Sequence, residues 1–459
     1  MLKFDDAPGL LWNVDLMRLE SFGWERLGVH ARRVRTLYIE PGHIPISPTI
    51  YLHIHAMCDS PLLPGLKKIY IPYNADFDLS SALFLTSQST LNMVHMYGDP
   101  ISDWEFFIPF LSSLYIKSPG LSHLALHETV LSFSAGVELI CRFKELQSFE
   151  IRLRYFSFPL HLLHKLGQLP HLLHLIIDAG DISSSKDIQP HKTPISINNS
   201  NFKQLRHLQI FGKTTIIHCI LNELKGLTNL SALKIDQNSK SYTEDSTSLT
   251  RTWKSFFEVI STFSALEDIE ISVDSNRQQV TKVPISTSSL VPLFRLDNLK
   301  SFVINDSILL SGPDEDFRLL AEGFPKLKKF FIPRSLLSDG RTLACLYYLS
   351  RECPDLRQIR ITLLSNIFDN LNAIKKLPHP IVRNYLHPLE KLYIDSDFGQ
   401  LQPIELVQVA RFLDLIFPNL STLETDKSKL TEAANWAGIH ELRSALRDAR
   451  INPSSVSDI

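Results

Sequence analysis

The 459-residue sequence is poor in glycine and in recognisable catalytic motifs. Only 17 residues are glycine, so glycine-rich loops that cradle phosphate groups are poorly supplied. No G-x-S-x-G elbow, H-E-x-x-H pair or phosphate-binding loop motif occurs in the sequence. We therefore expect that the protein is not an enzyme and that it requires no cofactor.

Cysteine is also scarce. The five cysteines are odd in number, are widely spaced and include no C-x-x-C pair: Cys58, Cys141, Cys219, Cys345 and Cys353. This spacing disfavours a disulfide scaffold and a zinc finger. It favours buried thiols in a reducing compartment.

The sequence has no excess of either charge and no long apolar run. There are 47 Lys and Arg residues against 49 Asp and Glu residues, which gives no general attraction to nucleic acid or to an anionic membrane. No run of about 18 apolar residues occurs, and the N-terminal residues lack a signal-peptide core. We expect a soluble monomer in the cytoplasm or nucleus that binds neither nucleic acid nor membrane.

What the sequence does contain is a repeat. A triplet of apolar residues recurs with a period of about 30 residues. Two free positions separate the first and second apolar residues of the triplet, and one free position separates the second and third. The fourteen first positions are Val34, Leu66, Leu91, Leu121, Leu146, Leu172, Leu205, Leu230, Leu266, Leu299, Leu327, Leu356, Leu389 and Leu420. The last two apolar residues of each triplet alternate as in a half-buried strand, whereas the segments between triplets have helical spacing.

One strand and one helix of this length cannot bury an apolar face alone, so stacked neighbours must supply the core. The repeat predicts an α/β fold, a leucine-rich-repeat solenoid or horseshoe with parallel strands on the concave face and helices on the convex face. The alternative is an ordinary α/β domain with leucine-rich strands. A proline two residues before the first leucine counts against it, because this offset recurs at Pro64, Pro119, Pro170, Pro325, Pro354 and Pro418.

The triplets divide the chain into an N-terminal cap region at 1–33, a solenoid of about fourteen irregular units at 34–426, and a C-terminal capping helix and tail at 427–459. The closing helix is expected at 430–450. Three polar insertions follow strand positions, at 180–200, 236–250 and 272–289. Two interpretations of these insertions stay open: binding loops on one rim, or disordered segments.

Four histidines within fourteen residues are the sharpest candidate for a metal site: His161, His164, His171 and His174. Zinc would need them convergent and tetrahedral. The repeat instead places the first two before the break at Pro170 and puts His174 on the exposed side of a strand. We therefore expect no metal site.

The free strand positions are the candidate partner-binding residues, because they alternate with the buried ones and so face the concave surface. They are His174, Asp178, His207, Gln209, Phe211, Lys234, Asp236, Asp268, Glu270, Lys329, Phe331, Arg360, Lys391 and Tyr393. An acidic patch around Asp236, Asp268 and Glu270 is followed by a basic one around Lys329, Arg360 and Lys391. The change of sign either orients a protein partner of complementary polarity or reflects ordinary solvated strand faces.

Four stretches carry a family resemblance: Trp24-Glu25-Arg26, the run from Ala31 to Leu37, the run from Pro61 to Leu66, and Leu83-Phe84-Leu85. They resemble the region just after the F-box in fungal, basidiomycete-type F-box leucine-rich-repeat proteins, and the likeness extends from about residue 10 onward. The resemblance implies the substrate-binding half of a ubiquitin-ligase receptor.

In that family an F-box further upstream docks onto a Skp-type adaptor. This chain begins too late to hold that module, so no adaptor-docking residue is carried over, and the adaptor is an expected partner only if an F-box exists upstream. Three alternatives remain open: the F-box was lost, the gene model starts at an internal methionine, or an upstream exon is absent. The competing functional hypothesis is a free-standing leucine-rich-repeat scaffold or inhibitor with no link to a ligase.

Overall fold

The structure is a computed structural model, and it describes residues 28–39, 63–73, 91–98, 104–127, 134–153, 160–180, 202–237, 246–273, 283–304, 308–332, 341–364, 366–378, 387–395, 398–425 and 430–451. It separates into two compact units, Met1–Gly212 (unit 1) and Lys213–Ile459 (unit 2). That all the repeats form one continuous solenoid stays a prediction.

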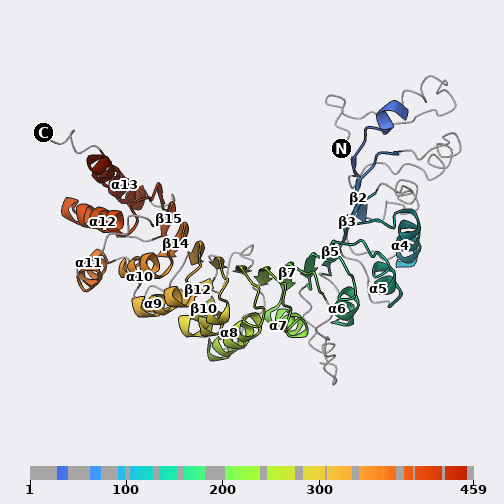
Figure 1. Ribbon diagram of the computed structural model, residues 1–459, viewed down its shortest axis with the longest axis horizontal. Helices are drawn as coiled ribbons and strands as arrows, with labels where there is room; N and C mark the ends of the chain where they lie inside the picture. Colours follow the sequence, from blue (N-terminus) through green and yellow to red (C-terminus); the bar gives the residue numbers. More distant parts are fainter. Residues whose placement is uncertain are drawn as a thin grey trace. The chain divides into compact units, whose positions relative to one another are not determined.

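Unit 1 contains a parallel sheet whose strands follow one another in chain order. The strands are β1 (Thr36–Tyr38), β2 (Lys68–Tyr73), β3 (Met93–Gly98), β4 (His123–His127), β5 (Ser148–Arg152), β6 (His174–Asp178) and β7 (His207–Gly212). Helices α4 (Trp104–Lys117), α5 (Ser134–Ile140) and α6 (Leu160–Leu166) lie along one face of this sheet (Figure 1). The opposite strand face is called the open face of unit 1.

Unit 2 repeats this arrangement. Its main sheet is also parallel and in chain order, with strands β8 (Ala232–Gln237), β9 (Asp268–Val273), β11 (Ser301–Ile304), β13 (Lys329–Ile332), β14 (Gln358–Thr362), β15 (Lys391–Asp395) and β16 (Thr422–Glu424). The helices are α7 (Thr214–Glu223), α8 (Ser246–Ile260), the 3₁₀ helix η3 (Thr287–Arg295), α9 (Asp314–Gly323), α10 (Ala344–Glu352), α11 (Ile367–Lys375), α12 (Pro403–Ile416) and α13 (Leu430–Ile451). The strand face away from the helices is the open face of unit 2.

The strand register follows the triplets. Leu124 lies beside Phe149, and Phe149 lies beside Leu175, so that equivalent apolar residues of successive repeats stack in one buried row. The second residue of each triplet is buried in all but the first and last repeats, where Leu37 and Leu423 are half-buried. Leu233 and Ile359 illustrate the rule, with exposed fractions of 2% and 0%. The predicted α/β leucine-rich-repeat fold is therefore confirmed.

Most of the described main-sheet strands are preceded by a tight turn that begins three positions before the first leucine, usually at a buried residue. The turn closes with a backbone hydrogen bond from the leucine N–H, as in Leu327 to Phe324 O, 3.2 Å, and Leu420 to Phe417 O, 3.2 Å. Pro325 occupies the second position of such a turn, where its fixed φ is already correct. The recurrent proline is thus a turn residue as well as a helix terminator. Sequence reasoning overlooked the buried position before it.

Successive repeats are also joined just before the strands begin. The carbonyl oxygen of Asn92 accepts hydrogen bonds from the N–H groups of Ser122 and His123, at 3.0 and 2.9 Å. The carbonyl of Glu267 does the same for Lys300 and Ser301, at 2.7 and 2.9 Å. These paired bonds fix the register of each new strand, which determines which side chains meet on the open face.

The insertions at 236–250 and 272–289 are not entirely loops, which corrects that part of the sequence interpretation. Helix α8 begins inside the first of them, at Ser246. Inside the second, β10 (Val283–Ser286) forms a separate two-stranded parallel sheet with β12 (Ile308–Ser311). The insertion at 180–200 lies outside the described residues except for Gly180.

Helix α13 follows the last strand and packs against α12 and β16. Its residues Trp436 and Ile439 are buried, at 1% and 0% exposed. The buried guanidinium of Arg443 donates hydrogen bonds to the carbonyl oxygens of Phe417, 3.0 Å, and Leu420, 3.2 Å. The helix covers the range expected from spacing and is one residue longer, whereas the expected N-terminal cap lies almost wholly outside the described residues.

Candidate functional site

All of the predicted partner-binding residues lie on the open faces and are exposed or half-buried. Unit 1 carries His174, Asp178, His207, Gln209 and Phe211, and unit 2 carries Lys234, Asp236, Asp268, Glu270, Lys329, Phe331, Arg360, Lys391 and Tyr393. Strand alternation explains this placement, because each of these residues lies next to a buried residue of a triplet. Their role in binding stays a prediction.

Two of the predicted residues in unit 1 form a histidine pair. His174 on β6 is the register partner of His207 on β7, and their rings stack with centroids 4.5 Å apart and an interplanar angle of 6°. Burial lowers the pKa of His174, and the neighbouring His207 lowers it further. The stacked rings present a flat aromatic surface on the open face.

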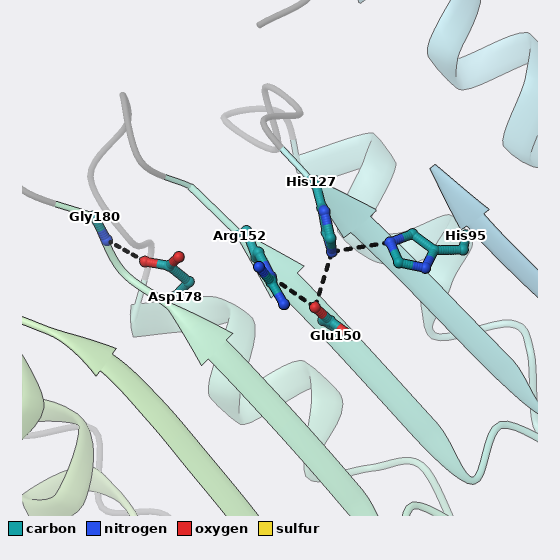
Figure 2. A network of polar contacts seen from close by, with 6 residues as sticks. All are labelled: His95, His127, Glu150, Arg152, Asp178 and Gly180. Atoms are coloured by element: carbon teal, nitrogen blue, oxygen red, sulfur yellow. Dashed lines mark hydrogen bonds and ion pairs between the residues drawn. The ribbon is translucent and has the colours of Figure 1, made fainter. Parts of the chain in front are cut away.

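A polar network on the open face of unit 1 was not predicted (Figure 2). Nε2 of His127 lies 2.8 Å from Oε1 of Glu150 and 3.2 Å from Nε2 of His95, and Arg152 donates from Nε to the same carboxylate oxygen at 2.7 Å. Burial alone would raise the pKa of Glu150. The hydrogen bond from His127 and the charge of Arg152 outweigh it and hold that pKa at about 2.

The network fixes the ring tautomers. An ionised carboxylate only accepts hydrogen bonds, so Nε2 of His127 must carry a proton to bond Glu150. The same proton then faces Nε2 of His95, which must be the unprotonated nitrogen of that ring. Burial, followed by the charge of His127, lowers the pKa of His95 to about 4, which keeps this ring neutral.

Aromatic rings extend from this network toward β1. Tyr38 and Tyr70 stack with centroids 4.1 Å apart, and Tyr70 lies 5.4 Å from the ring of His95. The three residues share one row of the sheet, because each lies between the last two apolar residues of its triplet. That common offset is a signal in the sequence that could have identified the row.

On the open face of unit 2, part of the negative charge of the acidic side chains is neutralised by a neighbouring lysine. Glu270 forms an ion pair with Lys234, 2.9 Å from Nζ to Oε1, and the hydrogen bond to Glu270 raises the pKa of Lys234. The hydroxyl of Ser272 donates a hydrogen bond to Asp236. Asp268, in contrast, makes no ion pair with any described residue.

Elsewhere on the open face of unit 2, basic side chains lie beside aromatic rings. We call Lys329, Phe331, Arg360, Lys391 and Tyr393 the basic–aromatic patch. They come from β13, β14 and β15, whose register aligns Lys329 with Gln358 and Lys391 and aligns Phe331 with Arg360 and Tyr393. Nζ of Lys329 lies 4.6 Å from the centroid of the Phe331 ring. The rings of Phe331 and Tyr393 meet edge to face across β14, 6.0 Å apart.

The four clustered histidines are spread over different elements. His164 lies on α6, His171 in the following turn and His174 on β6, and the side chain of His161 lies outside the described residues. Within the described ranges, no three His, Cys, Asp or Glu side chains are grouped so that they could hold a metal ion.

The described cysteines are free thiols, and a membrane-spanning segment is not found either. Cys141, Cys219, Cys345 and Cys353 form no disulfide, and Cys58 lies outside the described residues. Of the helices that the structure describes, none combines the length and the apolar character that a membrane crossing would require.

Comparison with known proteins adds little. No protein-family model matches the chain, and no curated protein matches it. Among solved structures, a leucine-rich-repeat protein of Leptospira interrogans is similar at 14% sequence identity and a TM-score of 0.39, over 87% of this chain and 86% of that one. The assignment of the leucine-rich-repeat fold therefore rests on the strand register and the burial pattern of this chain itself.

Proposed function

We propose that this chain is a protein-recognition module that binds a partner through the open faces of its parallel sheets. The observation that carries the proposal is the register, which in each unit aligns side chains of the main-sheet strands in rows across the open face, with polar and aromatic groups at many of the row positions. A surface built from many strands offers a partner an extended, rigid contact area. Aromatic residues and arginine, which dominate the binding energy of protein interfaces, occur in these rows.

The charges on the open face of unit 2 favour a partner whose own charge changes sign along the contact. Asp268, Ser301 and Lys329 are consecutive register partners in one row, so the face changes from acidic to basic within two strand steps. Complementary charges orient a partner more than they strengthen its binding. Reversing Asp268 to Lys should therefore slow association with the partner, and an unchanged association rate would remove this orienting role.

The resemblance to F-box leucine-rich-repeat proteins supports a more specific form of the proposal. In that form the open faces select protein substrates for ubiquitination, and an upstream F-box joins the chain to a Skp-type adaptor. The alternative is a scaffold or inhibitor that uses the same faces without a ligase. Expression from the native locus with a C-terminal tag separates them, because a ligase receptor retains the adaptor during purification and a free-standing scaffold does not.

Photo-crosslinking tests the general proposal. A photoreactive amino acid is placed at Gln209 on the open face of unit 1 or at Lys391 on that of unit 2, and for comparison at Lys254, which is exposed on α8. Crosslinking in cells of the source organism should give the same protein adduct from one or both open-face positions and not from α8. Adducts that form equally from Lys254, or no adduct from either open face, would contradict the proposal.

A further inference from the structure

Two lysines of the basic–aromatic patch carry positive charge that the described part of the chain does not neutralise. Lys329 and Lys391 make no ion pair with any described residue, and neither does the adjacent Lys328, which is exposed just before β13. The neighbouring charges differ in this respect, because Lys300 is paired with Glu267 at 2.6 Å and Arg357 with Glu390 at 3.7 Å. Unpaired lysines in one row next to paired ones mark a site that attracts an anion.

The rings of the patch add an apolar element. Phe331 and Tyr393 are both half-buried, so each ring keeps part of its surface open to solvent. Their edge-to-face contact spans β14 and holds both rings in fixed positions beside the ammonium group of Lys329. A partner side chain that packs against these rings is therefore surrounded by cations.

We infer that the basic–aromatic patch binds an acidic peptide segment that carries an aromatic or aliphatic side chain among its carboxylates. The inference rests on the proposed function and names the chemistry of the partner. Carboxylates of the segment pair with Lys329 and Lys391, and the apolar side chain packs against Phe331 and Tyr393. Aromatic residues near the centre of a protein interface often dominate its binding energy, and complementary charges around them orient the partner.

The same open face disfavours a nucleic acid. Asp268 lies in the row of Lys329, only two strand steps away, or about 10 Å. That distance is comparable with the screening length at physiological salt, so a uniformly negative phosphate backbone that extended along the row would be repelled there. A peptide can change its charge along its length and avoid this repulsion.

The test measures binding of a fluorescein-labelled peptide of about a dozen residues, rich in Asp and Glu with one central Phe, to the full chain by fluorescence polarisation. Affinity should fall as salt is raised toward about 1 M, because exposed charges are then screened. A peptide with Asn and Gln in place of the acids should bind far more weakly. Equal affinity for the neutral peptide would overturn the inference, and so would tighter binding of a single-stranded oligonucleotide or of anionic lipid vesicles.

Variants locate the site. The double variant Lys329→Ala/Lys391→Ala should weaken the acidic peptide about 3-fold to 30-fold, as expected for two exposed charge pairs. Lys225→Ala/Lys254→Ala removes the same charge from exposed positions away from the patch and should change affinity less than about 2-fold. Equal losses in the two double variants would contradict the assignment. Circular dichroism of each variant establishes that it is folded.

The apolar contact has a separate test. Phe331→Ser should weaken the Phe-containing peptide and leave a peptide with Ser in place of Phe almost unchanged, whereas Phe331→Leu should retain most of the affinity. If Phe331→Ser weakens both peptides equally, the packing role is wrong. If crosslinking at Gln209 or Lys391 gives adducts but the acidic peptide does not bind, only this inference is eliminated. If neither open face gives an adduct, the proposed function is eliminated.

Discussion

The imidazole of His127 and the carboxylate of Glu150 are bonded diagonally across β4 and β5. The distance from Nε2 to Oε1 is 2.8 Å, although the register partner of His127 is Arg152 and that of Glu150 is Ala125. Glu150 thus receives hydrogen bonds from a residue of the preceding repeat and from Arg152 on its own strand. The contact links two repeats through polar side chains on the open face, in addition to their buried apolar residues.

Glu150→Gln should destabilise unit 1 by about 1 to 3 kcal/mol at neutral pH, because an ionised acceptor that two donors share is replaced by a neutral one. Hydrogen–deuterium exchange of peptides from β4, β5 and β6 should show the loss of protection. Glu145→Gln, at an exposed position in the turn before β5, is the matched control and should leave exchange unchanged.

The difference in stability between the wild type and Glu150→Gln should depend on pH, because folding lowers the pKa of Glu150. The pKa of Glu150 is about 2 in the folded chain, below its ordinary value of 4.5. Its stabilising contribution is therefore complete above about pH 4.5 and is lost as the pH falls toward 2. The difference between wild type and Glu150→Gln should stay constant down to about pH 5 and shrink below it. A difference that grew on acidification would show that the carboxylate is not stabilised in its ionised form.

His387 should make unit 2 sensitive to mild acid. It is buried, its Nδ1 accepts a hydrogen bond from the N–H of Leu389 at 3.3 Å, and its Nε2 therefore donates to the carbonyl of Cys353 at 3.2 Å. Burial lowers its pKa to about 4. Because the folded pKa is below the ordinary 6.5, the stabilisation is present above pH 6.5 and is lost toward pH 4, by up to about 1.4 kcal/mol per pH unit.

The variant His387→Gln removes the ring that titrates. Exchange protection of β14 and β15 should then change less between pH 7 and about pH 5 than in the wild type. His171→Gln, at an exposed turn position in unit 1, should keep the wild-type pH dependence in these strands. If both variants responded to pH as the wild type does, His387 would not be the group that is protonated.

Arg443→Met should loosen the C-terminal end of unit 2. The methionine keeps an apolar stem but leaves the carbonyl oxygens of Phe417 and Leu420 without the guanidinium donor, which costs about 1 to 3 kcal/mol for a buried group. Exchange of α13 and β16 should accelerate. Arg447→Met, one turn further along the exposed side of α13, should have no measurable effect, and equal effects of the two variants would contradict the bonding role of Arg443.

The two buried thiols of α10 and its following turn should resist alkylation. Cys345 and Cys353 are 0% exposed, and burial raises the pKa of Cys353 to about 12 and that of Cys345 well above its ordinary value. Iodoacetamide labelling at about pH 8, read by peptide mass spectrometry, should modify the half-buried Cys141 and Cys219 first. In urea all four thiols should react at similar rates. Rapid native labelling of Cys345 would contradict its burial.

The repeat alone predicts the buried rows and the exposed rows, because the triplets set the strand register. Leu124 and Leu175 are buried, and His174 and Lys329 lie on open faces, as strand alternation predicts. The row of Tyr38, Tyr70 and His95 could also have been predicted, because residues at the same position in aligned triplets lie side by side in the sheet. Part of the candidate surface was thus predictable and was overlooked.

Other features cannot be predicted from the spacing of apolar residues in the sequence. His127 bonds Glu150 instead of its direct register partner because of side-chain rotamers, which no offset encodes. The small sheet of β10 and β12 is another example. Pro284 within a short polar insertion favours a loop, yet the structure pairs it with Leu309 in a parallel sheet.

The packing of α13 has a consequence for self-association. A parallel stack of strands normally ends in a row of unpaired backbone donors and acceptors, to which another chain can add. Because α13 packs against both α12 and β16, it takes the place that a further repeat would occupy. Helix α13 therefore hinders the addition of another chain beside β16.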